Sequence, residues 1–359
     1  MAKSLLFIPD ISGFTQFVKT TEVEHSQHVI AELLEVIIDA NTLNLELAEI
    51  EGDALFFYKE NIQLTQQSLL EQIKTMYTAF YSHLKLLEKN RVCTCNACAT
   101  APKLQLKIII HAGNLQFIEV KGNRKPFGNV VIEAHRLLKN SVPNDNYVLI
   151  SCELENEIGK LQNIESDLLS FQAGRDSYDS KEIKYQYALI EISKLQIKTF
   201  EEPKFVTFNS LPNISFEKVF NVSAEVLIEQ ITNYKNRHNW VEGVDEFIYN
   251  EHEVTRLGTE HVCVINGKQL MFKTITKKGK PNQIIYGELT KIPFLIDELY
   301  QFFIITPKSN NSCLLDLEVY WKVKSPIKKM IIALFVKKQI LKSNTKAMNN
   351  LYCYLSENK

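Results

Sequence analysis

Two short segments near the N-terminus each place an aspartate where an apolar, strand-like run gives way to a turn. The segment FIPDISGFT carries Asp10, and the segment EIEGDALFF carries Asp53. Two carboxylates that meet at neighbouring strand ends can hold Mg²⁺, a hard cation that proteins bind through one or two carboxylates together with substrate phosphates. The two segments therefore favour a fold in which these strands lie close together, and they predict a nucleotide site.

Length and charge narrow the classes of protein that the chain can belong to. Its 359 residues exceed the usual size of one hydrophobic core, which predicts two domains. A composition that is 45% hydrophobic and 23% charged is that of an ordinary globular protein. The formal net charge of −1 argues against general nucleic-acid binding, which depends on a basic surface.

Targeting signals and cysteine usage indicate the cytoplasm. The first residues, MAKSLLFIPDISGF, hold only a short apolar run before an aspartate and make a poor secretory signal. The apolar stretches fall short of the roughly 18 residues that a transmembrane helix needs. Seven cysteines are an odd number for a disulfide framework and are typical of a reducing compartment. We predict a soluble, cytoplasmic protein.

The periodicity of apolar residues predicts a ferredoxin-like domain in the first half. Helical spacing covers residues 29–38 and 64–90, whereas strand patterns cover residues 5–11, 43–50, 54–58 and 104–111. Glu51, Gly52 and Asp53 form a short turn, so the second and third strands make a hairpin. The resulting order, β-α-β-β-α-β, is that of a ferredoxin-like fold. We expect residues 115–121 to pair with the fourth strand, followed by a helix at 129–140 and a strand at 147–151.

The second half has the element order of a helix-grip fold. The pattern breaks down near residues 195–213, so we predict one domain over 1–195, a linker over 196–213 and a second domain over 214–359. A strand at 216–222 leads to a helix whose N-cap is Ser223. Several strands follow between residues 246 and 323, and a long helix runs from Pro326 to about Ser356. The predicted fold class is α+β in both domains.

Four segments of the first half resemble, in order, the motifs of class III nucleotidyl cyclases. FIPDISGFT is similar to the opening motif F-x-D-I-x-G-F-T, and EIEGDALFF is similar to the E/K-x-x-G-D hairpin. LKIIIHAG is similar to the R-x-G-I-H-x-G strand, and GNVVIEAHRL is similar to the helix motif G-x-x-V-N-x-A-x-R-L. The resemblance covers about residues 5–191 and implies an adenylate or guanylate cyclase-like domain.

The resemblance implies roles for particular residues. In such cyclases the 3′-hydroxyl of a nucleoside triphosphate attacks its own α-phosphate, with two metal ions held by a pair of aspartates. Asp10 and Asp53 match that pair and imply Mg²⁺ or Mn²⁺. Glu49 matches a position that contacts the purine, where glutamate mildly favours guanine. Backbone N–H groups at a helix start would hold the β and γ phosphates; they belong to Ile11, Ser12, Gly13, Phe14 and Thr15.

The chain also departs from the cyclase pattern. The helix asparagine that places the ribose falls on Ile132, which cannot donate a hydrogen bond, whereas the transition-state arginine is matched by Arg136. Lys107 replaces the strand arginine. The positive charge is kept, but the planar guanidinium group that can donate two parallel hydrogen bonds is lost. The second purine contact falls near Lys125. For the triphosphate lysine the nearest residues are Lys181 and Lys184. Metal and phosphate binding are therefore better supported than turnover.

Simpler interpretations remain for several of these residues. Asp10 on its own could cap the following helix, and Asp53 could be a turn carboxylate. Arg136 could form a salt bridge on a helix surface. We expect His111 and His135 to be structural rather than catalytic. In the cyclase family the site forms at a head-to-tail dimer interface, so a homodimer is implied, with Asp10 and Asp53 of one chain facing Arg136 of the other.

A separate cluster of thiols follows the second long helix. Cys93, Cys95 and Cys98 form C-x-C-x-x-C, which can present three thiolates to one soft cation such as Zn²⁺. Zn²⁺ normally takes four ligands, so the fourth would be a histidine such as His83, a group from another chain, or water. The alternative is a group of unliganded or redox-active surface thiols.

The second half resembles START-like proteins, the polyketide cyclase/dehydrase and lipid-transport superfamily. The resemblance spans about residues 216–357, includes the turn that bears Trp240, and implies an apolar ligand cavity between helix and sheet. Aromatic residues that could line the cavity or fill a core are Tyr286, Phe294, Tyr300, Phe302 and Phe303.

The terminal helix combines an apolar stripe with lysines, which fits two interpretations. Its apolar residues are Ile327, Ile331, Leu334, Phe335 and Ile340, and its lysines are Lys328, Lys329, Lys337, Lys338 and Lys342. Such a helix can lie on an anionic membrane, but more often it packs on a core with its lysines in solvent. We expect the second arrangement.

Three functional hypotheses follow. The first is a cyclase-like enzyme regulated by an apolar ligand in its START-like half. The second is a degenerate cyclase fold that binds nucleotide or serves as a scaffold, which Ile132 favours. The third is a lipid or small-ligand carrier that acts through the second domain alone. The whole chain resembles an uncharacterised bacterial family that joins these two domains, which leaves the activity open.

Overall fold

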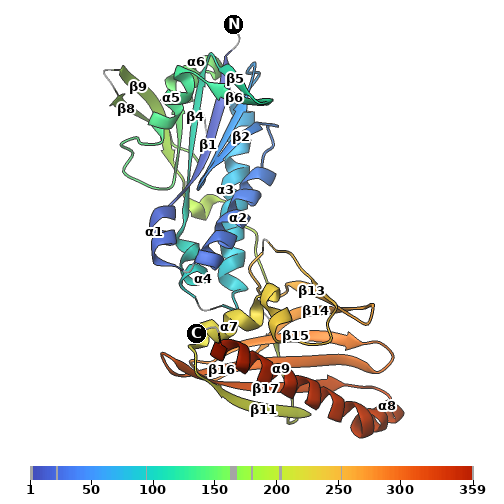
Figure 1. Ribbon diagram of the computed structural model, residues 1–359. Coiled ribbons are helices and arrows are strands. Elements are labelled where there is room, and N and C mark those ends of the chain that lie inside the picture. The colour runs from blue at the N-terminus through green and yellow to red at the C-terminus, as the bar shows by residue number, and fades with distance from the viewer. Residues whose placement is uncertain are drawn as a thin grey trace. The chain divides into compact units, whose positions relative to one another are not determined.

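The computed structural model describes residues 3–21, 23–93, 95–161, 168–178, 181–201, 204–251 and 253–357. Packing divides the chain into two compact units (Figure 1). The first holds Met1–Leu86 and Thr100–Phe200, and the second holds Leu87–Ala99 and Glu201–Lys359. Each unit is built on a large sheet, so the protein is a mixed α+β structure.

The sheet of the first unit has the strand order β2-β3-β1-β4-β7-β9-β8. Neighbouring strands are antiparallel except for β4 and β7, which are parallel. The strands are β1 (Ser4–Ser12), β2 (Glu46–Glu51), β3 (Ala54–Lys59), β4 (Gln105–Gly113), β7 (Tyr147–Ser151), β8 (Gln172–Tyr178) and β9 (Lys181–Leu189). Strand β1 lies between β3 and β4, so its backbone is paired on both edges.

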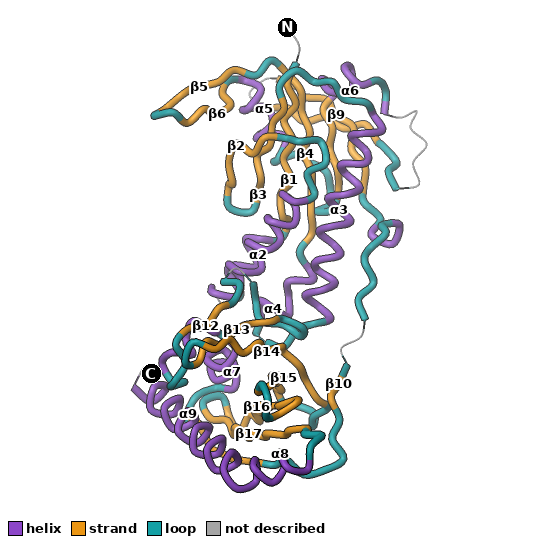
Figure 2. The backbone as a smooth tube through the Cα atoms, turned by 90° about the vertical axis from the view of Figure 1, so that its right-hand side faces the viewer, coloured by secondary structure: helices purple, strands orange, loops and turns teal. Residues whose placement is uncertain are grey.

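Helices pack against both sides of the central strands. Leu6 and Ile8 of β1 share a core with Ala134 and Leu137 of helix α5. Helices α2 and α3 run beside each other along the sheet (Figures 1 and 2), and the Tyr77 hydroxyl of α3 donates to the Tyr147 carbonyl of β7 at 2.6 Å. The helices of this unit are α1 (Phe14–Thr20), α2 (Val23–Asp39), α3 (Gln66–Lys89), α5 (Asn129–Leu137) and α6 (Cys152–Ile158), with 3₁₀ turns at Ala101–Lys103 and Ile192–Lys194. Helix α4 (Asn96–Thr100) lies mainly in the segment that belongs to the second unit.

The predicted β-α-β-β-α-β order is confirmed by β1, α2, β2, β3, α3 and β4. The expected pairing of residues 115–121 with β4 is wrong. Strand β5 (Gln116–Val120) instead forms a separate hairpin with β6 (Asn123–Phe127). The physical reason is that β1 and β7 already occupy both edges of β4.

The sheet of the second unit has the order β11-β17-β16-β15-β14-β13-β12 and is antiparallel along that path. Its strands are β11 (Ile214–Phe220), β12 (Glu246–Ile248), β13 (Glu260–Ile265), β14 (Lys268–Lys277), β15 (Ile284–Ile292), β16 (Ile296–Ser309) and β17 (Ser312–Lys322). The short β10 (Phe205–Val206) pairs in parallel with β14, within the segment that we expected to be a linker.

Two helices of this unit share one core with the sheet. Leu227 of α7 (Ala224–Thr232) and Met348 and Leu351 of α9 (Lys337–Glu357) pack with side chains of β11, β16 and β17. The Ser223 side chain accepts a hydrogen bond from Val226 N, which confirms the predicted N-cap. A 3₁₀ turn (Tyr234–Asn239) follows α7.

The long terminal helix is interrupted by a π turn. Helix α8 (Pro326–Ile331) passes into η5 (Ile332–Val336), a π-helical segment, before α9 begins. The expectation that the apolar stripe of this helix packs on the core is wrong for most of it. Ile340 is partly buried, whereas Ile327, Ile331, Leu334 and Phe335 are exposed. The reason is that Ile332 and Val336, on another face, fill the contact with the sheet.

Candidate functional site

The fold places Asp10, Asp53 and Lys107 on three adjacent segments of one sheet. Asp10 lies on β1 opposite Ala54 of β3 on one side and opposite Lys107 of β4 on the other. Asp53 is in the β2–β3 turn, directly before Ala54, and its carbonyl accepts a hydrogen bond from Ile11 N at 3.0 Å. Lys107 Nζ lies 3.2 Å from Asp10 Oδ2. The two aspartates that the sequence singled out are therefore neighbours.

The electrostatics of this group fit a cation site. Burial raises the pKa of Asp53 to about 6, and the nearby Asp10 carboxylate adds to the shift. Burial also raises the pKa of Asp10, although Lys107 opposes the change. Two neighbouring carboxylates repel each other when both are ionised, and a divalent cation between them removes this repulsion. Lys107 already supplies one positive charge to Asp10, a contact that the sequence did not reveal.

The segment that the resemblance assigned to phosphate binding joins β1 to α1. Ile11 and Ser12 end the strand and are buried, Gly13 has a φ of 89° and precedes α1, and Phe14 and Thr15 begin the helix. A left-handed backbone at this position suits glycine. The interpretation of Asp10 as the helix N-cap is wrong, because Gly13 holds that place and Asp10 belongs to the strand. The Ser12 hydroxyl is buried without a hydrogen-bond partner among the described residues.

The two residues assigned to the purine contact each other. Glu49 lies on β2 next to a bulge, and Lys125 lies on β6. Lys125 Nζ is 3.0 Å from Glu49 Oε2, with both side chains about half exposed. The Glu49 carboxylate is therefore already paired with the Lys125 ammonium group. A purine bound at this position would share the carboxylate with Lys125.

Helix α5 carries the remaining cyclase-motif positions. Ile132 is 49% exposed, and Arg136 is half-buried in the last turn. The same helix contributes Glu133 to a network that the sequence did not identify: His111 and Lys181 hold the pKa of Glu133 at about 2. Lys181 is thus paired with a carboxylate. The buried His111 also contacts Ser151 at 2.9 Å, in keeping with the structural role expected for it.

The three thiols of the C-x-C-x-x-C segment lie together. The Sγ atoms of Cys93, Cys95 and Cys98 are within 4.8 Å of one another, and all three residues are buried. Cys95 N donates to Cys93 Sγ and Cys98 N donates to Cys95 Sγ, each at 3.4 Å. The interpretation as surface thiols is wrong. His83, suggested by the sequence as a fourth ligand, has its Nε2 2.7 Å from Glu32 Oε2, and its role as a ligand stays a prediction.

A third group, which the sequence did not point to, is buried in the second unit. Arg237 Nη2 lies 2.5 Å from Glu288 Oε1, and Tyr286 donates to the same oxygen at 2.6 Å. Burial alone would disfavour both charges, but the mutual attraction raises the pKa of Arg237 and lowers that of Glu288. Burial lowers the pKa of the adjacent His261 to about 4. The alternation of Tyr286 and Glu288 on β15 placed both on one face, but nothing local revealed Arg237 as the partner.

This ion pair borders a pocket of about 640 Å³. The pocket is lined by Arg237 and Trp240 at the 3₁₀ turn, by Phe272 and Glu288 of the sheet, and by Ala347 and Met348 of α9. Tyr286 and Phe303 pack together in the core beside it. The wall thus combines aromatic surface with a buried charge pair.

Comparison with known sequences gives two partial matches. Residues 30–147 match a family described as a protein of unknown function (DUF2652). Over 122 residues, 34% of this chain, the sequence is 33% identical to the uncharacterized protein Rv2561/Rv2562 of Mycobacterium tuberculosis (strain ATCC 25618 / H37Rv). The match spans 57% of that protein's length.

Comparison with solved structures finds nucleotidyl cyclase domains over about half of the chain. The guanylyl cyclase Cya2 is 15% identical, with a TM-score of 0.40, and the match covers 55% of this chain and 97% of that one. The adenylyl cyclase CyaB from P. aeruginosa is 16% identical, with a TM-score of 0.37, covering 53% and 94%. The guanylate cyclase domain of RhGC from Catenaria anguillulae, in complex with GTP, is 14% identical, with a TM-score of 0.35, covering 53% and 97%. No helix in the described ranges has the length and apolar character needed to cross a membrane.

The raised pKa of Asp53 predicts a stabilising substitution. The folded-state pKa of about 6 exceeds the ordinary value of 3.8, so ionisation of Asp53 destabilises the fold as the pH rises through this interval. Asp53→Asn cannot ionise and should be more stable than the parent protein by about 1 kcal/mol at pH 7.5, allowing for solvent screening of a half-buried group. The free energy of unfolding from urea titrations measures the difference.

The gain should disappear at pH 4, where the parent Asp53 is largely protonated in the folded state. Asp145→Asn, at an exposed turn position, is the matched control and should change stability little at either pH. An equal gain for Asp53→Asn at both pH values would contradict the electrostatic explanation.

Proposed function

We propose that the first unit binds a nucleoside triphosphate through a divalent cation at Asp10 and Asp53 and converts it to a 3′,5′-cyclic nucleotide and pyrophosphate. The observation that carries the proposal is the register of β1. This register pairs Asp10 with Lys107 on one side and with Ala54, the residue after Asp53, on the other. The two aspartates thus lie close together, as the order of the cyclase-like motifs requires.

The chain's own residues have distinct parts in this proposal. Asp10 and Asp53 would hold Mg²⁺ or Mn²⁺, which neutralises phosphate charge and favours ionisation of the attacking 3′-hydroxyl. Lys107 keeps a positive charge beside Asp10, and Arg136 is assigned to the charge that develops on the transferring phosphate. Glu49 would accept hydrogen bonds from guanine, so GTP is the preferred substrate in this proposal.

A homodimer would complete the site. Exposed apolar side chains gather on β2, on the β5–β6 hairpin and on α5; they are Leu47, Ile50, Ile118, Val120, Phe127 and Ile132. These elements lie close together, since Lys125 contacts Glu49 and His135 lies 3.6 Å from Glu51. Several exposed apolar side chains on neighbouring elements are a feature of protein–protein interfaces. A second copy seated there would bring its own α5 toward Asp10 and Asp53.

The alternative is a degenerate domain that binds nucleotide without turnover, and Ile132 favours it. Loss of one transition-state hydrogen bond lowers a rate by about 10²–10³. The two versions share the cation site and differ only in product formation.

The decisive experiment is incubation of the full chain with each nucleoside triphosphate and Mn²⁺ or Mg²⁺, with mass spectrometry of the products. The enzyme hypothesis predicts a slow yield of cyclic nucleotide, highest with GTP, that Asp53→Ala abolishes. Ile132→Asn restores the hydrogen-bond donor and should raise the rate at least tenfold, whereas the exposed control Ile192→Asn should not.

Nucleotide binding without product from the parent or Ile132→Asn would support the degenerate version. No cation-dependent nucleotide binding by calorimetry would reject both. Phe127→Glu tests the dimer separately. It should reduce the sedimentation coefficient to that of a monomer and remove product while leaving the isolated fold intact.

The pocket of the second unit supports a second candidate function, binding of a small amphipathic molecule by a START-like helix-grip domain. The seven-stranded antiparallel path with α7 and α9 on it fits that architecture. Because the wall holds the Arg237–Glu288 pair, the ligand would have an apolar body and a hydrogen-bonding head rather than being wholly apolar. It would act as a regulator of the first unit or as the cargo of a carrier.

Filling the pocket tests this function. A fluorescent long-chain fatty acid should bind the parent protein saturably, and Ala347→Trp, in the pocket wall, should weaken binding at least tenfold. Ala333→Trp, at an exposed helix position outside the pocket, is the matched control. Unchanged binding by Ala347→Trp would place the probe elsewhere.

The thiol segment supports a structural metal site of the Zn²⁺ type. Three buried sulfurs within one short segment, two of them accepting backbone N–H bonds, fit thiolate ligation of a soft cation, with a fourth ligand from outside the segment. Purified protein should contain one zinc per chain by elemental analysis, and Co²⁺ exchange should give tetrahedral thiolate absorption bands.

Cys95→Ser should lose the metal and the cobalt bands, whereas Cys313→Ser, at an unrelated buried thiol, should keep both. Full cobalt absorption in Cys95→Ser would reject the site.

A further inference from the structure

The terminal helix of the second unit has two apolar faces, and only one of them meets the sheet. Ile332 is buried with Ile296 and Val323, and Val336 and Ile340 pack partly against the same cluster. A second stripe at helical spacing points away from the sheet and is exposed; it consists of Ile327, Met330, Ile331, Leu334 and Phe335. Leu334 is 63% exposed and Phe335 is 70% exposed. Burial in this unit therefore does not explain the second stripe.

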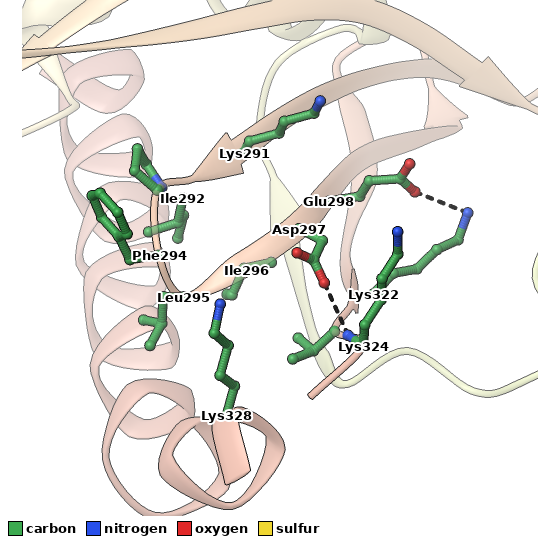
Figure 3. Close-up of a pocket in the computed structure, with 12 residues that line it drawn as sticks. Lys291, Ile292, Phe294, Leu295, Ile296, Asp297, Glu298, Lys322, Lys324 and Lys328 are labelled. Carbon is green, nitrogen blue, oxygen red and sulfur yellow. Dashed lines mark hydrogen bonds and ion pairs between the residues drawn. The ribbon is translucent and has the colours of Figure 1, made fainter. Parts of the chain in front are cut away.

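An aromatic residue at a neighbouring turn extends this apolar surface. Phe294, in the turn between β15 and β16, is 93% exposed and has a positive φ of 65°. A bulky residue in left-handed backbone is an outlier that costs stability and often marks function. The turn packs beside the helix, because Leu295 and Ile332 share one cluster. Figure 3 shows Phe294 and Leu295 on the side of the turn that faces the helix.

The surface around these residues is strongly basic. Between Val319 and Ser356 the sequence has eight lysines and no aspartate or glutamate. Among the described residues, none of Lys291, Lys324, Lys328, Lys329, Lys337 and Lys338 forms a side-chain ion pair. These six lysines and the exposed apolar residues named above are called the basic apolar face below.

A hollow of about 510 Å³ lies within this face, between the turn and the start of α8. Lys291, Lys324 and Lys328 line it from three different segments (Figure 3). The two acids at its edge are occupied: Glu298 lies 3.0 Å from Lys322 Nζ, and Asp297 accepts from Lys324 N at 2.9 Å. The remaining lysine charges are free to meet an external anion.

We propose that the basic apolar face docks on an anionic lipid membrane. Phe294, Leu334 and Phe335 enter the boundary between headgroups and acyl chains, and the surrounding lysines contact lipid phosphates and carboxylates. Exposed apolar side chains flanked by lysines are the combination that binds such interfaces. The hollow lined by Lys291, Lys324 and Lys328 has the size and charge for a single anionic headgroup.

Charge complementarity favours lipid over a second copy of the chain. A two-fold contact through this face would set lysines against lysines, and like charges across an interface are unfavourable. An anionic bilayer supplies the opposite charge over the whole face. The attachment is peripheral, since no described helix could span a bilayer.

Vesicle co-sedimentation of the full chain tests the proposal. We expect binding to phosphatidylcholine vesicles that contain phosphatidylserine, little binding to pure phosphatidylcholine, and weakening as salt screens the lysines. Lys328→Gln with Lys329→Gln should lower the partition constant about 25-fold, because each lysine near an anionic surface contributes about fivefold. Lys268→Gln with Lys278→Gln, exposed lysines elsewhere in the unit, is the charge control.

The apolar contribution is tested by substitutions with matched exposure. Leu334→Ser should lower binding about tenfold, whereas Met271→Ser on β14, which is also 63% exposed, should leave it unchanged. Phe294→Gly removes the aromatic side chain without destabilising the fold, because glycine adopts the positive φ of this position without strain. That variant should unfold no more easily than the parent protein and still bind vesicles at least tenfold less tightly.

Three results would overturn the proposal. The first is equal binding to vesicles with and without phosphatidylserine. The second is unchanged vesicle binding by Leu334→Ser and Phe294→Gly. The third is a dimer in sedimentation velocity that Leu334→Ser dissociates, with no vesicle binding by the parent chain, which would assign the face to a second copy.

Discussion

The pairing of β1 between β3 and β4 is the constraint on which the first unit depends. Both edges of β1 are hydrogen-bonded, and its apolar side chains are buried on both faces. A slip of one residue would move every side chain of this strand to the opposite face of the sheet. The same register therefore fixes the core and the position of Asp10 relative to Lys107 and Asp53. The same backbone hydrogen bonds thus determine both the packing of the core and the geometry of the proposed cation site.

The second unit contains a buried ion pair whose two charges depend on each other. Arg237 and Glu288 are each almost fully inaccessible, and each is kept charged by the other. Removing one partner of such a pair typically costs about 3–5 kcal/mol, whereas an apolar replacement of both can be neutral. A buried ion pair is therefore weak evidence for what makes this sheet stable. The Arg237–Glu288 pair lines the pocket in which we propose that a ligand binds.

Much of the first unit could be predicted from short-range patterns. The strands, the helices and the hairpin around Asp53 follow from local periodicity and turn chemistry, and the motif order placed Asp10 and Asp53 together. The contact between Lys107 and Asp10 depends on a register between distant segments, which periodicity does not define. The pairing predicted for residues 115–121 is wrong because a strand pattern does not show which edges of the neighbouring strand are already paired.

The second unit was harder to predict for the same reason. Arg237 lies in a short 3₁₀ turn and Glu288 in a strand far along the chain, so neither suggests the other. The terminal helix shows a different limit. Its sequence contains two apolar stripes, and only the tertiary structure shows that Ile332 and Val336, rather than Leu334 and Phe335, meet the sheet.

One segment of the chain has a consequence for how the two units can be separated. Residues Leu87–Ala99 lie in the sequence inside the first unit but pack as part of the second. Val92 belongs to the core that contains Trp240 and Met348, and Leu257 N donates to Asn90 O at 2.8 Å. A truncated gene beginning at codon 201 would encode the sheet of the second unit without the segment Leu87–Ala99 that packs with it. Independent expression of the C-terminal half therefore calls for a circularly permuted or grafted chain rather than a simple deletion.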